Sequence, residues 1–339
     1  MGSVSPSMAS TSPFGLHFHI GGVRIPNRAV LAPMAGLTIS AYRRHLKSHG
    51  VGLVTTEMVS VHGLLHHNVR TAEYLKMADD ERPVALQLFG DTPEAMAGAV
   101  DIVLSRPRPP DIIDINMGCP VRKVVKTGAG AALLGDPERA LAVAAAAVGV
   151  AAVRGIPVTV KLRSGLRAAD GERALVLGRR LEEAGVAGLC IHPRYAEQMY
   201  RGRADHSLTA AMVGSVRVPV VASGDVDSFA SASAVLASTG AHAVMLARGA
   251  AGNPWLADDL LAGEDRPRPS LAVVISDLRL LLARVAEERG PERTARWMRK
   301  LLGWYLRPSG VSPTVVRRLR ELSDVPELDA ALAEMASSL

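Results

Sequence analysis

Cys119 is the residue whose type and surroundings most suggest chemistry. It follows the β-branched run at residues 111–116 and stands between a glycine and a proline in the stretch NMGCPVRK. A neutral thiol, with an ordinary pKa of about 8.5, is mostly protonated at neutral pH and can donate a proton to a reacting atom. Gly118 permits a close approach here, and Pro120 stiffens the exit from the turn. The cysteine by itself also fits a buried, inert thiol, since free cysteines are commonly buried.

Polar side chains also end several other short hydrophobic runs. Alternate side chains of a strand point to opposite faces, so polar residues between apolar ones face away from the apolar packing layer. Those expected to face one side together are Gln87, Asp114, Asn116, Lys161, Arg163, Cys190 and His192, and two further runs end in Ser223-Gly224-Asp225 and Ala247-Arg248. A single inward amide can merely satisfy core hydrogen bonds, but a buried Lys161 without an anionic partner is costly. Together these strand ends predict one shared binding site, with Cys190 as a core residue beneath it.

The elements that must position these residues alternate between strands and helices. Eight β-branched runs, with helix-like stretches between them, occupy residues 29–34, 52–58, 83–90, 111–116, 156–163, 187–193, 218–225 and 242–248. This repetition is typical of a (β/α)8 TIM barrel, whose functional groups lie at the C-terminal strand ends. The last two strand loops of such a barrel commonly bind phosphate, which predicts a phosphorylated cofactor beside Arg248. A doubly wound sheet is the alternative, but APMAGLT is not its glycine-rich dinucleotide turn.

A change of pattern near residue 262 indicates a second domain. The segment EDRPRPS is a charged linker that contains prolines, and the periodicity after it is helical only. We therefore expect a disordered tail over residues 1–14, a catalytic barrel over 15–262 and a small C-terminal helical domain over 263–339.

The helical domain carries a basic face in a basic protein. Arg293, Arg296, Lys300 and Arg307 would share one face of a helix, with Trp297 and Trp304 at its borders. The chain has a net charge of +6 and a pI near 9.6. A basic face is usually solvated surface, but on a separate module of a basic protein it fits phosphate-backbone binding at least as well.

Other features bear on cellular location and on metal binding. The start of the chain lacks an apolar signal core, and the apolar run at 141–153 is too short to span a bilayer. Two cysteines do not suggest a disulfide framework, so we expect a cytoplasmic protein without membrane contact. No Cys or carboxylate nearby completes a ligand set for His62, His66 and His67, so we expect no metal.

Taken in order, these residues resemble the tRNA-dihydrouridine synthases, most closely the bacterial B-type branch. The matching pieces are VLAPMAGLT, TEMVS, VALQLFG, DIIDINMGCPVRKVVKTGAGAALL, VTVKLRSG, IHPRYAEQMYRGRAD, VVASGDV, VMLARGAAGNPW and RKLLGWYL, over residues 15–335. The resemblance implies an enzyme that uses FMN, with NADPH or NADH as reductant, to convert specific uridines of tRNA to 5,6-dihydrouridine. The implied cofactor-binding residues are Pro33, Met34, Ala35, Gln87, Asn116, Lys161, His192, Ser223, Gly224, Asp225, Ala247 and Arg248. The chain departs from the family at Ser223, Ala247 and His206, where the family usually has Asn, Gly and Trp.

The resemblance also implies a catalytic role for Cys119. Hydride from reduced FMN would add to C6 of uracil, and the thiol would protonate the resulting enolate at C5. Because a stacked base cannot reach the pocket, the uridine would be flipped out of the RNA. The residues expected to hold the base or the tRNA are Lys123, Arg163, Arg194, Tyr195, Arg293, Arg296 and Lys300. We expect the enzyme to act as a monomer.

Two other functions remain open on the sequence. One is an FMN-dependent ene-reductase of a small enone or nucleoside, recruited from the same family. The other is a non-catalytic RNA-binding protein. The basic helical domain argues against the first, and the presence of Cys119, Lys161 and His192 argues against the second.

Overall fold

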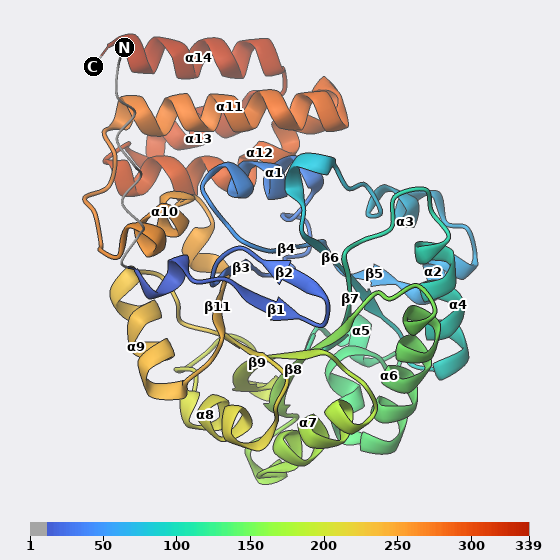
Figure 1. Cartoon of the computed structure of the whole chain (residues 1–339). Helices are drawn as coiled ribbons and strands as arrows, with labels where there is room; N and C mark the ends of the chain where they lie inside the picture. Colours follow the sequence, from blue (N-terminus) through green and yellow to red (C-terminus); the bar gives the residue numbers. More distant parts are fainter. Residues whose placement is uncertain (1–11, 339) are drawn as a thin grey trace, which may run out of the picture.

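The computed structural model describes residues 12–338, in which a ring of parallel strands is surrounded by helices (Figure 1). In ring order the strands are β3 (Ala29–Leu31), β11 (Ala243–Leu246), β10 (Val220–Ser223), β9 (Gly188–Tyr195), β8 (Val158–Gly165), β7 (Ile112–Met117), β6 (Val84–Phe89) and β4 (Val54–Thr55). A backbone bridge between Val30 and Leu53 joins the first to the last, and β5 (Val59–Ser60) pairs with β6. The predicted (β/α)8 barrel is confirmed.

Strand register decides which side chains line the barrel. Residues opposite one another on neighbouring strands are Gln87 and Asp114, Asn116 and Lys161, Lys161 and Cys190, and Arg163 and His192. The apolar residues that alternate with them, such as Leu86, Ile115 and Leu162, pack in the layer between strands and helices. Cys190 instead packs inside the barrel. The predicted alternation is therefore confirmed on these strands.

Helices cover the outside of the ring. They are α1 (Ser40–Ser48), α2 (Val61–Leu65), α3 (Val69–Glu73), α4 (Pro93–Leu104), α5 (Arg122–Val125), α6 (Pro137–Ala152), α7 (Arg173–Glu183), α8 (His206–Ser215), α9 (Phe229–Thr239) and α10 (Trp255–Ala262). Short 3-10 turns are η1 (Pro13–Gly15), η2 (Asp79–Glu81), η3 (Gly130–Gly135), η4 (Ala168–Asp170), η5 (Ala196–Gln198), η6 (Arg248–Ala250) and η7 (Arg307–Ser309). The local sequence determines where some of these helices begin. Thr92 caps the N-terminus of α4 and Asp136 caps that of α6, and each is followed by a proline at the first helical position.

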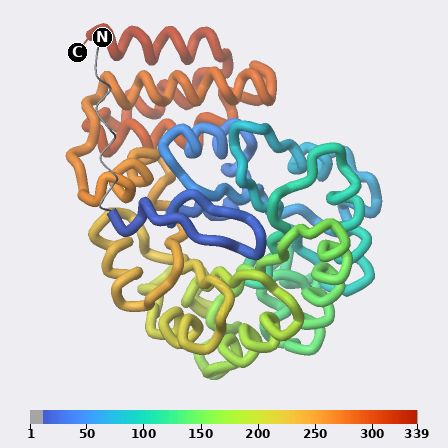
Figure 2. Tube along the Cα trace, viewed as in Figure 1, coloured from blue at the N-terminus to red at the C-terminus, as the bar shows by residue number. Residues whose placement is uncertain are grey.

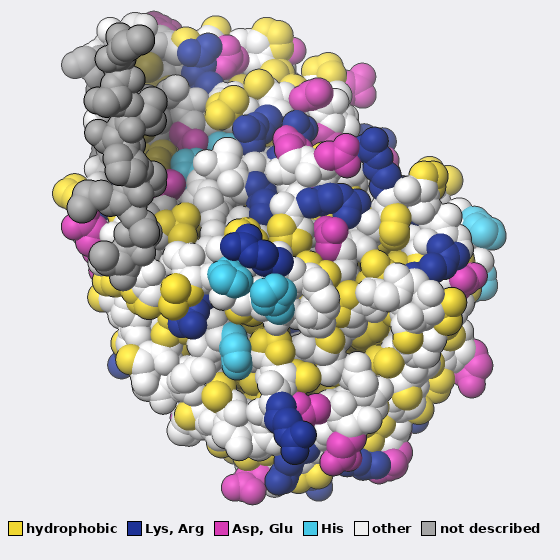
Figure 3. Space-filling view, viewed as in Figure 1, with side chains coloured by type: hydrophobic (Ala, Val, Ile, Leu, Met, Phe, Trp, Pro, Cys, Tyr) yellow, Lys and Arg dark blue, Asp and Glu magenta, His cyan; other side chains and the backbone are white. Residues whose placement is uncertain are grey.

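An N-terminal hairpin closes the end of the barrel opposite the mouth. Its strands, β1 (Phe18–Ile20) and β2 (Val23–Ile25), pack Phe18, Ile20 and Ile25 against interior residues of the barrel. Figure 3 views this hairpin-covered end, over which basic, acidic and histidine side chains are interspersed. The hairpin was not predicted from the sequence. Because it covers one end of the barrel, the C-terminal strand ends at the other end form the accessible mouth.

The segment just before the hairpin is packed as well. Phe14, within η1, is fully buried, and the hydroxyl of Ser12 donates to the carbonyl oxygen of Leu260. The prediction of a disordered tail is therefore wrong for residues 12–14, because the aromatic ring of Phe14 belongs to the core. Residues 1–11 of that predicted tail lie outside the described residues.

The C-terminal helices stack on one side of the barrel, next to its first and last α/β units (Figure 2). They are α11 (Leu271–Arg289), α12 (Pro291–Leu306), α13 (Pro313–Glu321) and α14 (Val325–Ser337). Their apolar faces share one core with α1 and α10, and Trp297 is buried in it while Trp304 is exposed. Trp297 was expected at the border between the basic and the apolar face of the helix, and its burial in the core corrects that placement. Among the described residues, no helix is both long and apolar enough to cross a membrane.

Candidate active site

Cys119 lies in the loop between β7 and α5, at the mouth of the barrel. The side-chain Oδ1 of Asn116 accepts hydrogen bonds from the backbone N–H groups of Gly118 (3.1 Å) and Cys119 (2.8 Å). Gly130, with φ of +61°, fits tightly against this loop, since a Cβ there would lie 2.9 Å from the carbonyl oxygen of Cys119. Burial raises the pKa of the Cys119 thiol, although the side chain remains partly accessible. The loop thus presents a protonated thiol at the mouth.

A buried chain of hydrogen bonds fixes Asn116. Its Nδ2 donates to Oε1 of Gln87 (2.8 Å), whose Nε2 donates to Oδ2 of Asp114 (2.6 Å). Asp114 also accepts from the hydroxyl of Thr159 (2.6 Å), and burial raises the pKa of this carboxyl to about 6. Gln87 and Asn116 were expected to contact a flavin, but much of their hydrogen-bonding capacity is used within the protein. Their first effect is to position the loop that carries the thiol.

Two cations at the mouth carry charge that the described residues do not neutralise. The half-buried side chain of Lys161 makes no hydrogen bond or ion pair within residues 12–338. Arg248, exposed at the start of η6, lies 5.2 Å from the ring centre of Tyr200 and forms no ion pair in the same part of the chain. Because an ammonium is costly to bury without a counterion, the site suits an anionic ligand.

Arg163 ties three segments of the mouth together. It is 2% exposed; its Nε donates to the carbonyl oxygen of Gly118 (2.9 Å), and Nη1 donates to those of Tyr195 (3.2 Å) and Met199 (2.8 Å). These bonds differ from the RNA contact expected of it. Its guanidinium also lies 5.6 Å from the ring centre of Tyr200, which therefore bridges Arg163 and Arg248. Tyr200 was not among the predicted site residues, although it lies within the matched piece IHPRYAEQMYRGRAD.

A second brace joins β9 to the loop after β10. Nη1 of Arg194 lies 3.0 Å from Nε2 of His192, and since arginine only donates, this nitrogen accepts and the ring proton lies on Nδ1. Burial, together with nearby cations, lowers the pKa of His192 to about 2, so the ring is neutral. Nη2 of Arg194 donates to the carboxylate of Asp225 (2.6 Å), which also accepts from the backbone N–H of Ala204 (2.7 Å). The Asp225 carboxylate is thus held by protein donors, and Arg194 is not free to hold RNA.

The other residues predicted for cofactor or base are distributed around the same mouth. Pro33, Met34 and Ala35 follow β3. Ser223 is the last residue of β10, Gly224 comes directly after it, and Ala247 follows β11. Lys123 is exposed on α5, and Tyr195 is half-buried at the end of β9. The structure therefore gathers residues from strands far apart in the sequence at one end of the barrel.

The basic residues of α12 differ in their surroundings. Arg293 forms an ion pair with Glu73 of α3 (2.9 Å), and Nζ of Lys300 donates to the carbonyl oxygen of Gly36 (2.6 Å). Arg296 is exposed and makes no ion pair within the described part of the chain. Two of the three side chains thus attach the helical domain to the barrel, and one remains available to a partner.

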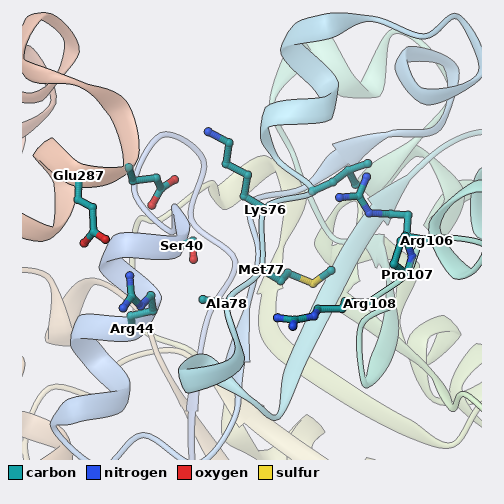
Figure 4. A pocket seen from close by; sticks show the side chains of 11 residues that line it. Ser40, Arg44, Lys76, Met77, Ala78, Arg106, Pro107, Arg108 and Glu287 are labelled. Carbon is teal, nitrogen blue, oxygen red and sulfur yellow. The ribbon is translucent and has the colours of Figure 1, made fainter.

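A cleft of about 580 Å³ lies apart from the mouth and shares none of its residues (Figure 4). Its lining includes Ser40, Arg44, Leu75, Lys76, Met77, Ala78, Arg106, Pro107, Arg108, Glu287 and Glu288. Arg44 pairs with Asp80 (2.7 Å) and Arg108 with Asp79 (2.5 Å). Since acids balance its bases, the cleft does not compete with the mouth as the candidate site.

The fold and the mouth define a barrel enzyme that presents a protonated thiol, together with two cations that residues 12–338 leave unpaired. Residues 30–338 match the family model described as dihydrouridine synthase (Dus). The tRNA-dihydrouridine synthase B of Xanthomonas axonopodis pv. citri is 34% identical over 317 residues, covering 92% of this chain and 93% of the relative. A probable tRNA-dihydrouridine synthase of Rhizobium leguminosarum bv. phaseoli is 38% identical over 283 residues, which cover 83% of this chain and 86% of the relative. The chain belongs to the dihydrouridine synthase family of flavin-dependent oxidoreductases, as the resemblance predicted.

Two solved structures share the fold. The old yellow enzyme homologue from Zymomonas mobilis has a TM-score of 0.53 at 14% identity, covering 73% of this chain and 92% of that chain. The structure of TcOYE with pHBA has a TM-score of 0.56 at 12% identity, and the match covers 81% of this chain and 97% of that chain. At these identities the likeness concerns the barrel alone.

Proposed function

We propose that this enzyme reduces specific uridines of tRNA to 5,6-dihydrouridine, with FMN as its cofactor and NADPH or NADH as reductant. The observation that carries the proposal is the thiol of Cys119, which burial keeps protonated and which Asn116 holds at the barrel mouth. The names of the relatives from Xanthomonas and Rhizobium support tRNA as the substrate.

The residues at the mouth fit an anionic flavin nucleotide. Lys161, which has no counterion among the described residues, would hold the pyrimidine part of the flavin, and Arg248 would hold its phosphate. The backbone around Ser223, Gly224 and Ala247 would complete the phosphate site. Within residues 12–338 the Nδ1–H of neutral His192 has no hydrogen-bond partner, so it would donate to the cofactor. Pro33, Met34 and Ala35 would pack against the ring system.

Proton transfer is the step that this chain performs itself. When bound, FMN supplies the hydride that adds to C6 of uracil. Sγ–H of Cys119 then gives its proton to C5, and the thiolate that remains is stabilised by the charges of Arg163 and Lys161. The partly accessible sulfur regains a proton from solvent, which restores the donor.

The substrate must enter as a flipped nucleotide, because the thiol lies in a loop at the barrel mouth. We propose that Lys123 and Tyr195 contact this nucleotide, and that Arg296 contacts the tRNA backbone. Arg163, Arg194, Arg293 and Lys300 would then act indirectly, by fixing the loops and the helical domain around it.

The test is the dihydrouridine content of tRNA from a strain that lacks this gene. Loss of dihydrouridine at defined positions, restored by the intact gene, is the expected result. Unchanged content in a strain without any other member of the family would contradict the proposal. The purified protein should also be yellow, and a chain that takes up no FMN would contradict the cofactor assignment.

A further inference from the structure

A cluster of histidine and aspartate side chains lies where the barrel meets the helical domain. His45 and His49 are four residues apart at the C-terminal end of α1, Asp258 lies on α10, and Asp277 lies on α11. Oδ2 of Asp277 is 3.0 Å from Nε2 of His45, and its Oδ1 is 3.0 Å from Nε2 of His49. None of these side chains has a role in the proposed reaction.

We propose that His45, His49 and Asp277 form a binding site for a divalent transition-metal ion such as Zn²⁺. Their candidate ligand atoms all lie within 4.8 Å of one another. Two imidazoles and one carboxylate are a donor set that Zn²⁺ accepts, with a fourth position left for water. His45 lies in the last turn of α1 and His49 is the residue that caps its end, so the C-terminal end of one helix brings both rings to the cluster.

The surroundings support the same assignment. Nδ1 of His49 lies 2.6 Å from Oδ2 of Asp258, a contact of the kind that orients a ligating imidazole through its second nitrogen. On the other side, the hydroxyl of Tyr305 lies 3.3 Å from Nε2 of His45, so α12 also borders the cluster.

Charge and burial favour a dication at this position. The side chains of His45, Asp277 and His49 are 0%, 11% and 13% exposed, so the Asp277 carboxylate is poorly solvated here. Both ring nitrogens of His49 contact carboxylates, and a bound dication would take the place of the proton between His49 and Asp277. It would balance the charges of Asp258 and Asp277 with both imidazoles neutral, which is the form in which imidazole binds metal. Asp258, at 33% exposure, marks the edge through which an ion can enter.

A metal at this cluster would join α1 of the barrel to α11 of the helical domain. Its main effect would therefore be on the stability of their packing. The absence of metal expected from the sequence rested on a different group, His62, His66 and His67, which the structure leaves outside this cluster.

Metal binding can be measured on the full-length, flavin-loaded protein after treatment with a chelator. Equilibrium dialysis against Zn²⁺, followed by elemental analysis, should give a single ion per chain, and Zn²⁺ should raise the midpoint temperature of unfolding. His49→Gln and Asp277→Asn should weaken binding by about 100-fold, and Asp258→Asn by about tenfold. His66→Gln, the same substitution at an exposed histidine, should bind as the unchanged chain does.

The unchanged chain alone can overturn the proposal, whether or not the variants fold. Absence of stoichiometric Zn²⁺, or a midpoint temperature that Zn²⁺ does not raise, would do so. A cluster that only holds protons would give a midpoint that depends on pH but not on Zn²⁺, which also overturns it. So would a folded Asp277→Asn protein that binds Zn²⁺ as tightly as the unchanged chain.

Discussion

The two cysteines of this chain show how position determines the use of a side chain. Burial raises the pKa of both thiols, to about 12 for Cys190. Cys190 lies inside the barrel, with its sulfur 3.5 Å from that of Met245, where no substrate can reach it. Cys119 combines a protonated thiol with partial exposure at the mouth. The pair therefore offers a matched test of the proposed proton donor.

We predict that Cys119→Ala retains the flavin but slows its reoxidation by tRNA. Loss of a general acid costs about 100-fold or more in rate. The measurement is anaerobic oxidation of the reduced flavin by tRNA that lacks dihydrouridine. Cys190→Ala is the control. It should keep the rate of flavin reoxidation and lose about 1 kcal/mol in the free energy of unfolding. Equal rates for Cys119→Ala and the unchanged enzyme would exclude the thiol as donor.

The pH dependence of the reaction follows from the direction of the Cys119 pKa. Only the thiol can donate, and it is populated below its pKa, which burial raises above the ordinary value. The rate of flavin reoxidation by tRNA should therefore stay constant from neutral pH up to about 8.5 and fall only at higher pH. A rate that already halves between neutral pH and that value would show a donor with a lower pKa.

At the scale of elements, the end of β7 and its loop act as one unit. Asn116 accepts two backbone hydrogen bonds from the loop and is held in turn by Gln87 on β6. Arg163 and Arg194 hold the segments that follow β7, β9 and β10 in the same way. The geometry of the thiol thus depends on hydrogen bonds made by residues outside its own loop.

We predict that Asn116→Ala reduces both stability and rate although Cys119 is still present. Two N–H groups lose their acceptor, at a cost of about 2 kcal/mol in the free energy of unfolding. Asn68→Ala is a matched control, because Asn68 also accepts from two backbone N–H groups, at the start of α3. Denaturant unfolding and flavin reoxidation should separate the two, with only Asn116→Ala slowing reoxidation. Unchanged reoxidation in a folded Asn116→Ala enzyme would contradict the positioning role.

At the scale of the whole molecule, the helical domain is attached close to the mouth. Lys300 donates to Gly36 in the loop after β3, and Arg293 pairs with Glu73 of the barrel. The shared core beneath these contacts orients α12 against the barrel. The part of α12 that carries Lys300 therefore lies beside the loop that follows β3 at the mouth.

We predict that Arg296→Gln weakens tRNA binding and lowers the slope of log K against log salt by about 1. Arg279→Gln is the control, because it removes the same charge from an arginine that Asp329 already neutralises (2.6 Å). Binding should be measured over a series of salt concentrations. If both variants lose the same affinity, net charge rather than a local contact would explain the effect.

The barrel, the inward-facing side chains of its strands and the position of the Cys119 loop could be predicted because they depend on local patterns. Alternation of apolar and polar residues correctly placed Gln87, Asn116 and Lys161 on the inner side. The hairpin escaped prediction because each of its strands has only three residues, too few for a periodic pattern. Phe14 was assigned to a tail because nothing in the sequence shows that the core has room for its ring.

The sequence by itself determined the fold class, the family and the cysteine that could act, because strand periodicity and motif spacing are properties of neighbouring residues. Only the tertiary structure decided that Arg163 and Arg194 are braces, since their partners are groups brought together by folding. The same holds for His45 and His49, whose spacing is visible in the sequence. Their carboxylate partner, Asp277, comes from a helix more than 200 residues later, and only packing of the helical domain brings it within 3.0 Å.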